Sequence, residues 1–374
     1  MSGHFALYDD DKKDLPEALS ALCRKLLESG TVDALLVAQH LPGSPMVQHT
    51  LVRSPDKLLA VDPAAPVLPV NGGVLAARLT RQDPGGRVGA LLRPCEIRAF
   101  FELVKLHQGD RQRIFLIGMD CMGTFEPPSY RDWAKANPDG SGKFLEAMLG
   151  QGAPPQGAPQ LRRCCRACEF PTGEGADLQL LLVGADGGPC LFAATEAGEA
   201  AAKDLNLKTV EAPGKRPKAV ETWIKGRTES RDQLFKEVES DLLPMDRLLE
   251  ELSSCISCYN CREVCPVCYC KSCVFEGNTF EHPASQYLRM AKKKGVIKMP
   301  TDSLFFHLTR MVHMSTSCVG CGQCSSACPM GIRVSEIFRT VARKTQSVFE
   351  YVPGRSLEEA LPLTTFREEE LSPT

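Results

Sequence analysis

Apolar and polar positions alternate along the first 210 residues in a way that predicts helices interleaved with short strands. Residues 15–27 repeat apolar side chains at helical spacing, and amphipathic helices are also expected at 95–106 and 196–205. Short apolar runs predict strands at 34–38, 46–52, 88–92, 114–119, 179–183 and 190–194. Strands that alternate with helices are typical of an α/β domain, which we expect over residues 1–210.

The remainder of the chain has a helical pattern. Residues 208–236 are charged, contain proline and carry few apolar side chains, which indicates a linker or a helical arm on the surface. An amphipathic stretch at 238–252 and helical patterns at 286–292 and 304–314 follow. We therefore expect a helical linker over 211–250, a mainly helical ferredoxin-like domain over 251–346 and a tail over 347–374.

Two copies of one cysteine spacing, C-x2-C-x2-C-x3-C-P, lie in this helical part. This spacing is the bacterial ferredoxin pattern, in which three close thiolates hold one 4Fe–4S cluster and the fourth binds the other cluster. Zinc sites are the alternative, but paired C-x2-C units would suffice for zinc. We expect one cluster on Cys255, Cys258, Cys261 and Cys328, and a second on Cys318, Cys321, Cys324 and Cys265.

Composition limits what these clusters can belong to. The chain has 374 residues, 18 cysteines and a formal net charge of -2, so nothing indicates binding to nucleic acid or to an anionic membrane. It has no run of eighteen apolar residues and no N-terminal secretion signal. Many cysteines without such a signal favour metal ligation in a reducing compartment over disulfides. We expect a cytoplasmic, oxygen-sensitive protein, and no motif supports hydrolytic chemistry.

Further cysteines predict additional clusters. Cys95 and Cys121 follow the predicted strands 88–92 and 114–119, and functional groups gather at such strand ends in α/β proteins. With Cys165 and Cys168 they could hold a third cluster, in which Cys164 could replace Cys165; alternatively, Cys95 and Cys121 are small buried hydrophobic residues. A fourth cluster on Cys268, Cys270 and Cys273 is as plausible as spare thiols there. We assign Cys23 and Cys190 to the core, and His307 to packing or to hydrogen bonds toward cluster sulfides.

Several segments resemble a known family. Residues 91–98, 116–123 and 165–177 resemble the β-subunit family of coenzyme F420 hydrogenases and dehydrogenases. Residues 255–273, 313–331 and 349–355 resemble the end of formate dehydrogenase β subunits and the small heterodisulfide reductase subunit. The resemblance implies FAD beside a 4Fe–4S cluster, and hydride exchange with a deazaflavin or nicotinamide carrier. The implied partner is a molybdenum or tungsten formate dehydrogenase catalytic subunit, or a heterodisulfide-reductase-like flavoprotein.

The flavin and its carrier leave alternatives open. Asn71, Gly72 and Gly73 lie at a predicted strand-to-helix turn where backbone amides could approach a phosphate, so we place the FAD against this turn and the Arg93 loop. An anaerobic flavoprotein β subunit that transfers electrons to a formate dehydrogenase partner is the leading hypothesis. A version that reacts with NAD(P)H keeps the same fold, whereas a flavin-free adaptor would connect two enzymes through clusters alone.

Iron analysis tests the cysteine assignments. Protein purified without oxygen should contain about twelve iron atoms per chain for three clusters, or about sixteen for four. A colourless protein with zinc at the two ferredoxin motifs would contradict the prediction.

Overall fold

The computed structural model describes residues 3–7, 15–277, 283–295 and 302–365. Its N-terminal part is built on one mixed sheet with the strand order β3-β2-β5-β6-β7-β8-β1-β9, and β4 pairs with β2. Strands β2, β5, β6 and β7 run parallel, and the remaining pairings in the sheet are antiparallel. The strands are β1 (His4–Ala6), β2 (Ala34–His40), β3 (Val47–Val52), β4 (Ala60–Val61), β5 (Val88–Leu92), β6 (Ile114–Met119), β7 (Leu178–Leu181), β8 (Cys190–Ala193) and β9 (Thr209–Val210).

Helices cover both faces of this sheet, because side chains of its central strands alternate between two cores. One core joins Leu35, Leu91 and Phe115 to helices α1 (Leu15–Glu28) and α7 (Glu196–Asp204). The other joins Leu36, Leu92 and Leu116 to α2 (Gly72–Thr80) and α3 (Pro94–Lys105). The predicted α/β domain is therefore confirmed, although the sequence analysis had no elements at β1, β4, β9, α4 (Pro127–Ala136) and α5 (Gly140–Gln151).

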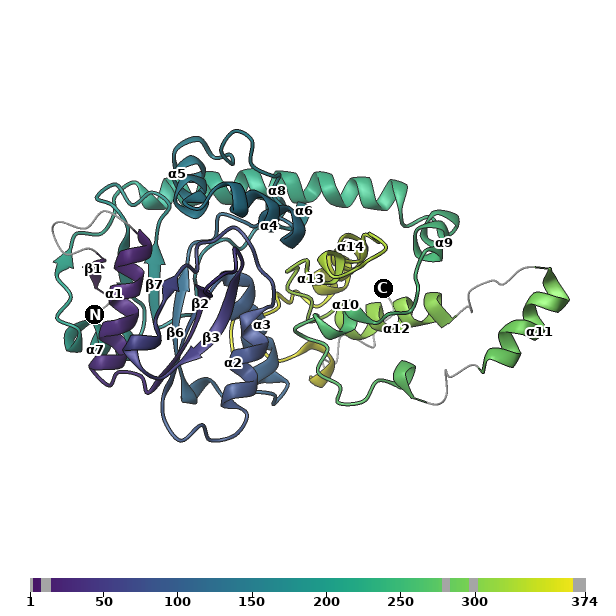
Figure 1. The fold of residues 1–374 in the computed structure, drawn as a ribbon, viewed down its shortest axis with the longest axis horizontal. Helices are drawn as coiled ribbons and strands as arrows, with labels where there is room; N and C mark the ends of the chain where they lie inside the picture. The colour runs from purple at the N-terminus through teal and green to yellow at the C-terminus, as the bar shows by residue number, and fades with distance from the viewer. Residues whose placement is uncertain (1–2, 8–14, 278–282, 296–301, 366–374) are drawn as a thin grey trace.

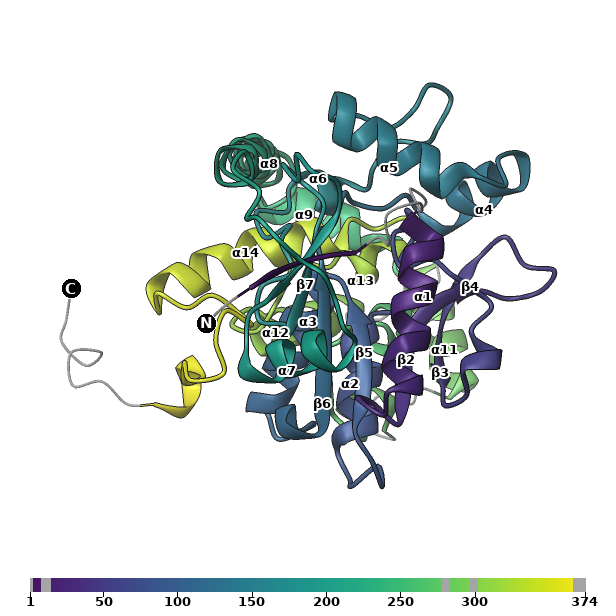
Figure 2. The ribbon, with the colours of Figure 1, turned by 90° about the vertical axis from the view of Figure 1, so that its left-hand side faces the viewer.

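The second part of the chain consists of helices and loops. Its longest element is α8, which occupies most of the segment for which a linker or helical arm was predicted and is seen end-on in Figure 2. It extends from the sheet to the ferredoxin motifs (Figure 1). The helices of this part are α8 (Arg216–Asp241), α9 (Met245–Ser253), α10 (Asn260–Glu263), α11 (Ala284–Lys294), α12 (Asp302–Met314), α13 (Gln323–Ser326) and α14 (Val334–Val348). The short helix α6 (Arg163–Arg166) lies earlier, before β7. Among the described residues, no helix has both the length and the hydrophobicity needed to cross a lipid bilayer.

Contacts along α8 join the two parts. Near its start, Arg216 forms an ion pair with buried Asp120 just past β6, with 2.6 Å between Nη1 and Oδ2. In its middle, Arg227 donates a hydrogen bond of 2.9 Å to the carbonyl of Met122. Toward its end, Leu234 and Val238 belong to the core that surrounds the ferredoxin motifs. One helix thus fixes the end of β6 relative to the ferredoxin motifs.

Residues 349–355 form a strap that binds the C-terminal part of the chain back to α3. Buried Glu102 accepts hydrogen bonds from the Tyr351 hydroxyl at 2.5 Å and from the Gly354 amide at 2.8 Å. Gly354 has a φ of +70°, and a Cβ there would lie 2.4 Å from the carbonyl oxygen of Arg98, so the strap approaches α3 as closely as only glycine permits. The predicted tail 347–374 is described up to residue 365, and its remaining residues lie outside the described part.

Tyr351→Phe should loosen this strap. The change leaves the Glu102 carboxylate with one hydrogen-bond donor fewer, which costs about 2 kcal/mol when the acceptor is charged. Because the Gly354 amide donates to the same oxygen, its hydrogen exchange should become about thirtyfold faster. Hydrogen exchange with mass spectrometry of peptides covering 349–355 measures this rate, and Tyr269→Phe, at a half-exposed ring, is the control. Equal exchange in Tyr351→Phe and the parent protein would contradict this role of the hydroxyl.

Candidate iron-sulfur centres

The parallel pairing of β5 and β6 brings two of the predicted ligands to one edge of the sheet. Leu92 at the end of β5 lies opposite Gly118 of β6, so the residues that follow both strands emerge side by side. Cys95 lies in the first turn of α3, and Cys121 follows β6 by two residues. One cavity at this edge is lined by all five cysteines that the sequence analysis grouped there: Cys95, Cys121, Cys164, Cys165 and Cys168.

The same cavity is also lined by Cys321 of the second ferredoxin motif. Burial raises the pKa of the Cys95 thiol well above its usual value, and the negative charges of Glu96, Cys121 and Cys321 add to this effect. Cys95 and Cys321 are therefore close enough to interact electrostatically. The thiols of the α/β domain and those of the second motif form adjoining groups.

Two consecutive cysteines of α6 have different surroundings. The Cys165 sulfur lies 3.3 Å from the Thr124 hydroxyl and 3.7 Å from Nη2 of Arg162. Cys164 instead packs against Gly322, where a Cβ would lie 2.1 Å from its sulfur, and it approaches the Cys321 carbonyl at 3.9 Å. A hydrogen bond from Cys164 and the charge of Arg162 hold the pKa of Cys165 well below its usual value despite burial. Cys165 thus favours the thiolate, the form that binds iron.

The thiols of the two ferredoxin motifs influence one another electrostatically, and the crosswise ligand sets stay a prediction. Burial raises the pKa of Cys255 and that of Cys261, the latter to about 11, and the charges of Cys258 and Cys328 raise both further. In the second set, burial is again the main cause of raised pKa values. The charge of Cys265 contributes to the raised pKa values of Cys318, Cys321 and Cys324.

Helix α12 supplies two buried nitrogen donors between these sets. Arg310 donates a hydrogen bond to the Cys261 sulfur at 3.2 Å and another to its carbonyl at 3.0 Å. Nε2 of His307 lies 3.4 Å from the Cys255 sulfur. Burial, aided by the charge of Arg310, lowers the pKa of His307 to about 4, so the imidazole is neutral near pH 7. Hydrogen bonds toward cluster sulfides were one of the two roles expected for His307, the other being packing. Arg310 was not predicted, although its position three residues later on the same helix face was an available signal.

Other buried arginines lie around Cys168, the cysteine that follows α6. Arg339 and Arg231 both form ion pairs with Glu169, the residue after Cys168. Arg98 stacks on the Phe170 ring, with 3.8 Å from Cζ to the ring centroid, and donates to the Val319 carbonyl in the second motif. The segment after Cys168 is therefore held directly against the segment after Cys318.

Buried donors without partners show that these surroundings fit an anionic cluster. In the described part of the chain, Nε of Arg310 and Nη1 of Arg339 are buried and make no hydrogen bond. Each belongs to a residue beside predicted ligand thiols, where sulfides and thiolates of a cluster would accept hydrogen bonds. No group of three or more His, Cys, Asp or Glu side chains has the geometry of a single-ion site in the same described ranges. A cubane does not need that geometry, because its four thiolates bind four different irons.

The residues predicted to contact the flavin are already engaged within the protein. The Gly72 amide donates to Glu96 at 2.7 Å, and the Gly73 amide donates to the side chain of Asn71 at 3.0 Å. The Arg93 guanidinium donates to the carbonyls of Pro63 and Ala65. One donor is left over, because Nδ2 of Asn71 is buried and has no partner among the described residues. The Glu96 carboxylate beside the turn disfavours a phosphate there. The contact assignment of Asn71, Gly72, Gly73 and Arg93 therefore stays a prediction.

The remaining cysteines divide into a loop group and a core group. Cys270 is exposed, whereas Cys268 and Cys273 are half-buried, and Arg262 donates to the Cys270 carbonyl at 3.2 Å. A fourth cluster on these three residues stays a prediction. Cys23 and Cys190 are buried in the α/β domain.

Comparisons with known proteins agree with these features. Residues 250–332 match the model of the 4Fe-4S dicluster domain. The F420-dependent formate dehydrogenase subunit beta of Methanocaldococcus jannaschii is 27% identical, with 92% of this chain and 93% of that protein covered. The F420-dependent formate dehydrogenase 1 subunit beta of Methanococcus maripaludis is 28% identical, with 92% of each covered. Among solved structures, a chain of the F420-reducing [NiFe] hydrogenase complex from Methanosarcina barkeri has a TM-score of 0.45 and 17% identity, covering 66% of this chain and 94% of that chain.

The predicted ferredoxin-like domain is thus confirmed as a 4Fe-4S dicluster domain. The family resemblance found in the sequence motifs is confirmed as well: over 92% of its length, this chain is similar to β subunits of F420-dependent formate dehydrogenases.

Proposed function

We propose that this chain is the electron-transferring β subunit of a multisubunit oxidoreductase of the formate dehydrogenase type. The observation that carries the proposal is the cavity at the edge of the sheet, which Cys95 and Cys165 line together with Cys321 of the dicluster domain. Sites of one-electron transfer in the two parts of the chain would therefore adjoin each other. Similarity to formate dehydrogenase β subunits over nearly the whole chain supports the same function.

We assign three cubanes to the thiols that the fold brings together. Clusters of this type supply one-electron transfer when bound. The ligands of the two dicluster centres are Cys255, Cys258, Cys261 with Cys328, and Cys318, Cys321, Cys324 with Cys265; those of the third are Cys95, Cys121, Cys165 and Cys168. We leave Cys164 out because it packs against Gly322 and lacks the polar contacts of Cys165.

The chain's own residues prepare these sites for negative charge. Arg162, which is 4% exposed, donates to Thr124 and to Ser326 of α13, and so links the third site to the second motif. Arg310, which is 3% exposed, donates to the Cys261 thiol in the first motif. Fixed guanidinium groups near buried thiolates stabilise the anionic form and raise the reduction potential of a cluster that they face.

A flavin completes the proposal. The relatives are named as F420-dependent, and a carrier that delivers two electrons as hydride needs a group that passes them on singly, which is the chemistry of FAD. We propose that this chain binds FAD near the third cluster and receives hydride from a deazaflavin carrier. The partner would be a formate dehydrogenase catalytic subunit, with a heterodisulfide-reductase-like protein as the alternative. The cysteine content of this chain favours a location in the reducing cytoplasm.

Cofactor extraction and carrier reduction test this function. In protein purified without oxygen, reduced F420 should bleach the visible flavin band and then give the electron paramagnetic resonance signals of reduced clusters. Bleaching by NADH or NADPH alone would favour the nicotinamide version. If the protein contained its full iron but no FAD, the flavin-free adaptor would be the remaining function. If it had no reducible clusters, electron transfer by this chain would be excluded.

Substitutions at α6 test the third ligand set. Cys165→Ser should remove about four of about twelve irons per chain, because one cubane loses a thiolate. Cys164→Ser, its matched neighbour, should keep all the iron and change the signal of the second motif's cluster at most slightly. Iron analysis and electron paramagnetic resonance of the two variants measure this difference. Loss of the cluster in Cys164→Ser with retention in Cys165→Ser would reverse the assignment.

A further inference from the structure

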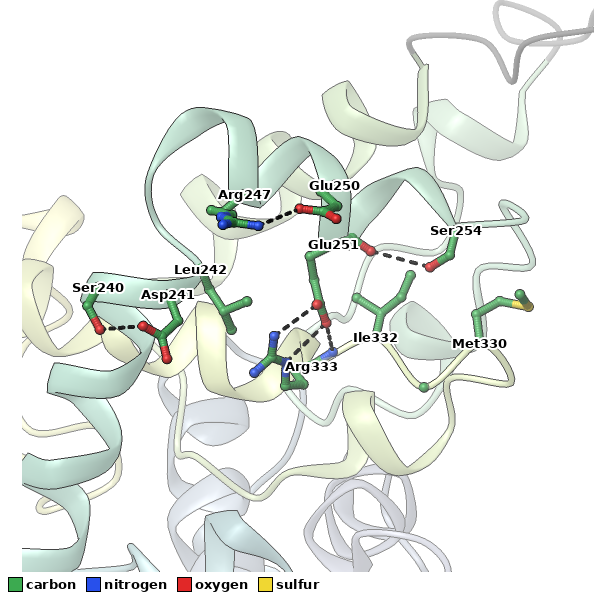
Figure 3. Close-up of a pocket in the computed structure, with 11 residues that line it drawn as sticks. Ser240, Asp241, Leu242, Arg247, Glu250, Glu251, Ser254, Met330, Ile332 and Arg333 are labelled. Carbon is green, nitrogen blue, oxygen red and sulfur yellow. Dashed lines mark hydrogen bonds and ion pairs between the residues drawn. The ribbon is translucent and has the colours of Figure 1, made fainter.

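A groove with acidic sides lies beside the first ferredoxin motif. Its sides are the end of α8, the helix α9 and the loop 330–333, and Figure 3 shows their side chains facing a common space. One ion pair crosses it, Arg333 with Glu251 at 3.1 Å, and a second, Arg247 with Glu250 at 3.0 Å, lies along α9. We call it the α8–α9 groove.

This groove adjoins segments that carry two of the predicted cluster ligands. Ser254, which lines it, immediately precedes Cys255, and Met330 follows Cys328 by two residues. Of the eight motif cysteines, Cys258 is exposed, whereas the other seven are buried or half-buried. The motif cysteine that reaches solvent, Cys258, follows Ser254 of the groove by four residues.

The surface around the groove combines exposed apolar side chains with acidic ones. The side chains of Met245, Ile256 and Met330 are 62%, 52% and 45% exposed. Several large apolar side chains exposed in this way can mark an interaction surface. Residues 237–251 contain six acidic residues and one basic residue. Ion pairs engage four of these acidic residues, Glu237, Glu239, Glu250 and Glu251. Exposed Asp241 and Asp246 have no ion-pair partner among the described residues, although Asp241 accepts a hydrogen bond from Ser240 and its charge acts on Arg333.

We propose that the α8–α9 groove and its apolar rim form the docking surface for the redox protein that exchanges electrons with this chain. Apolar contacts with a polar rim are typical of protein interfaces. The acidic sides select a partner with lysine and arginine around its own one-electron centre, because opposite charges steer encounter and fix orientation. This inference rests on the proposed function, since without clusters the groove would have no electron to pass on.

A charge-reversal experiment tests the surface with cytochrome c, a basic redox protein, as the probe. The chain, loaded with its clusters and reduced without oxygen, is mixed with oxidised cytochrome c, and the second-order rate constant is followed by stopped flow at low and high salt. The double variant Asp241→Lys/Asp246→Lys should react about tenfold more slowly than the parent at low salt, and the difference should shrink at high salt. Met245→Ser should slow the reaction at both salt concentrations.

Matched controls separate docking from other effects. Glu221→Lys/Glu229→Lys changes the net charge by the same amount on the part of α8 away from the groove, and should keep the parent rate to within about twofold, the scatter expected when no steering contact is lost. Reduction of duroquinone, a small neutral acceptor, should be equal in all variants, because the electron path to the surface is intact.

Four results would overturn the proposal. Parent-like rates in Asp241→Lys/Asp246→Lys at low salt would exclude the groove, and equal slowing in the control double variant would assign the effect to net charge alone. Self-association of the parent that the groove variants abolish, measured by sedimentation, would assign the surface to a second copy of the chain. If the parent protein gave no electron paramagnetic resonance signals after reduction, the proposed function would be wrong, and this inference with it. If the signals were intact but the groove variants reacted at the parent rate, only the docking surface would be wrong.

Discussion

The proposed clusters require many cysteines to be held as thiolates away from water. A buried negative charge costs several kcal/mol unless a positive charge or hydrogen-bond donors compensate it. This chain provides that compensation with guanidinium groups drawn from distant segments: Arg98 from α3, Arg162 before α6, Arg310 from α12 and Arg339 from α14. Each is less than a tenth exposed and lies against cysteines or their flanking residues. The arginines also connect the parts of the chain, so the electrostatic requirement of the sites and the cohesion of the fold are met by the same side chains.

This double role explains why the two parts of the chain form one body. Arg162 bonds both Thr124 of the α/β domain and Ser326 of α13, and Arg98 bonds both Pro353 of the strap and Val319 of the second motif. Electron transfer needs fixed distances between centres, and a hinge between the two parts would change them. Helix α8 and the strap brace the same junction from two further sides. The rigidity follows from polar contacts at buried positions, where they are least screened by water.

The sequence made the local chemistry predictable and left the long-range contacts open. Two repeated cysteine spacings predicted a dicluster domain because cubane ligation requires nearby thiolates, and parallel strands placed Cys95 and Cys121 together because their ends share one sheet edge. Arg339 could not be foreseen, since nothing in its neighbours along the chain records that it faces thiols folded from elsewhere. Arg310 was indicated only by its place on the same helix face as His307. The Asn71-Gly72-Gly73 turn was ambiguous for a different reason. A Cβ at Gly73 would lie 2.2 Å from the Glu96 carbonyl, so close packing of α2 on α3 already requires glycine, and such a turn has the same sequence as one that approaches a phosphate.

The choice between Cys164 and Cys165 illustrates where geometry adds what spacing cannot. Consecutive residues of a helix point about 100° apart, so two adjacent cysteines rarely serve one centre equally well. In α6 this divergence directs Cys165 to Thr124 and Arg162, and directs Cys164 to the backbone of the second motif at Gly322 and Cys321. Gly322 has a φ of +76°, and any side chain there would displace Cys164. In the proposed assignment, Cys164 therefore has a structural reason to be a cysteine-sized residue: it fills the contact between the third ligand set and the second motif.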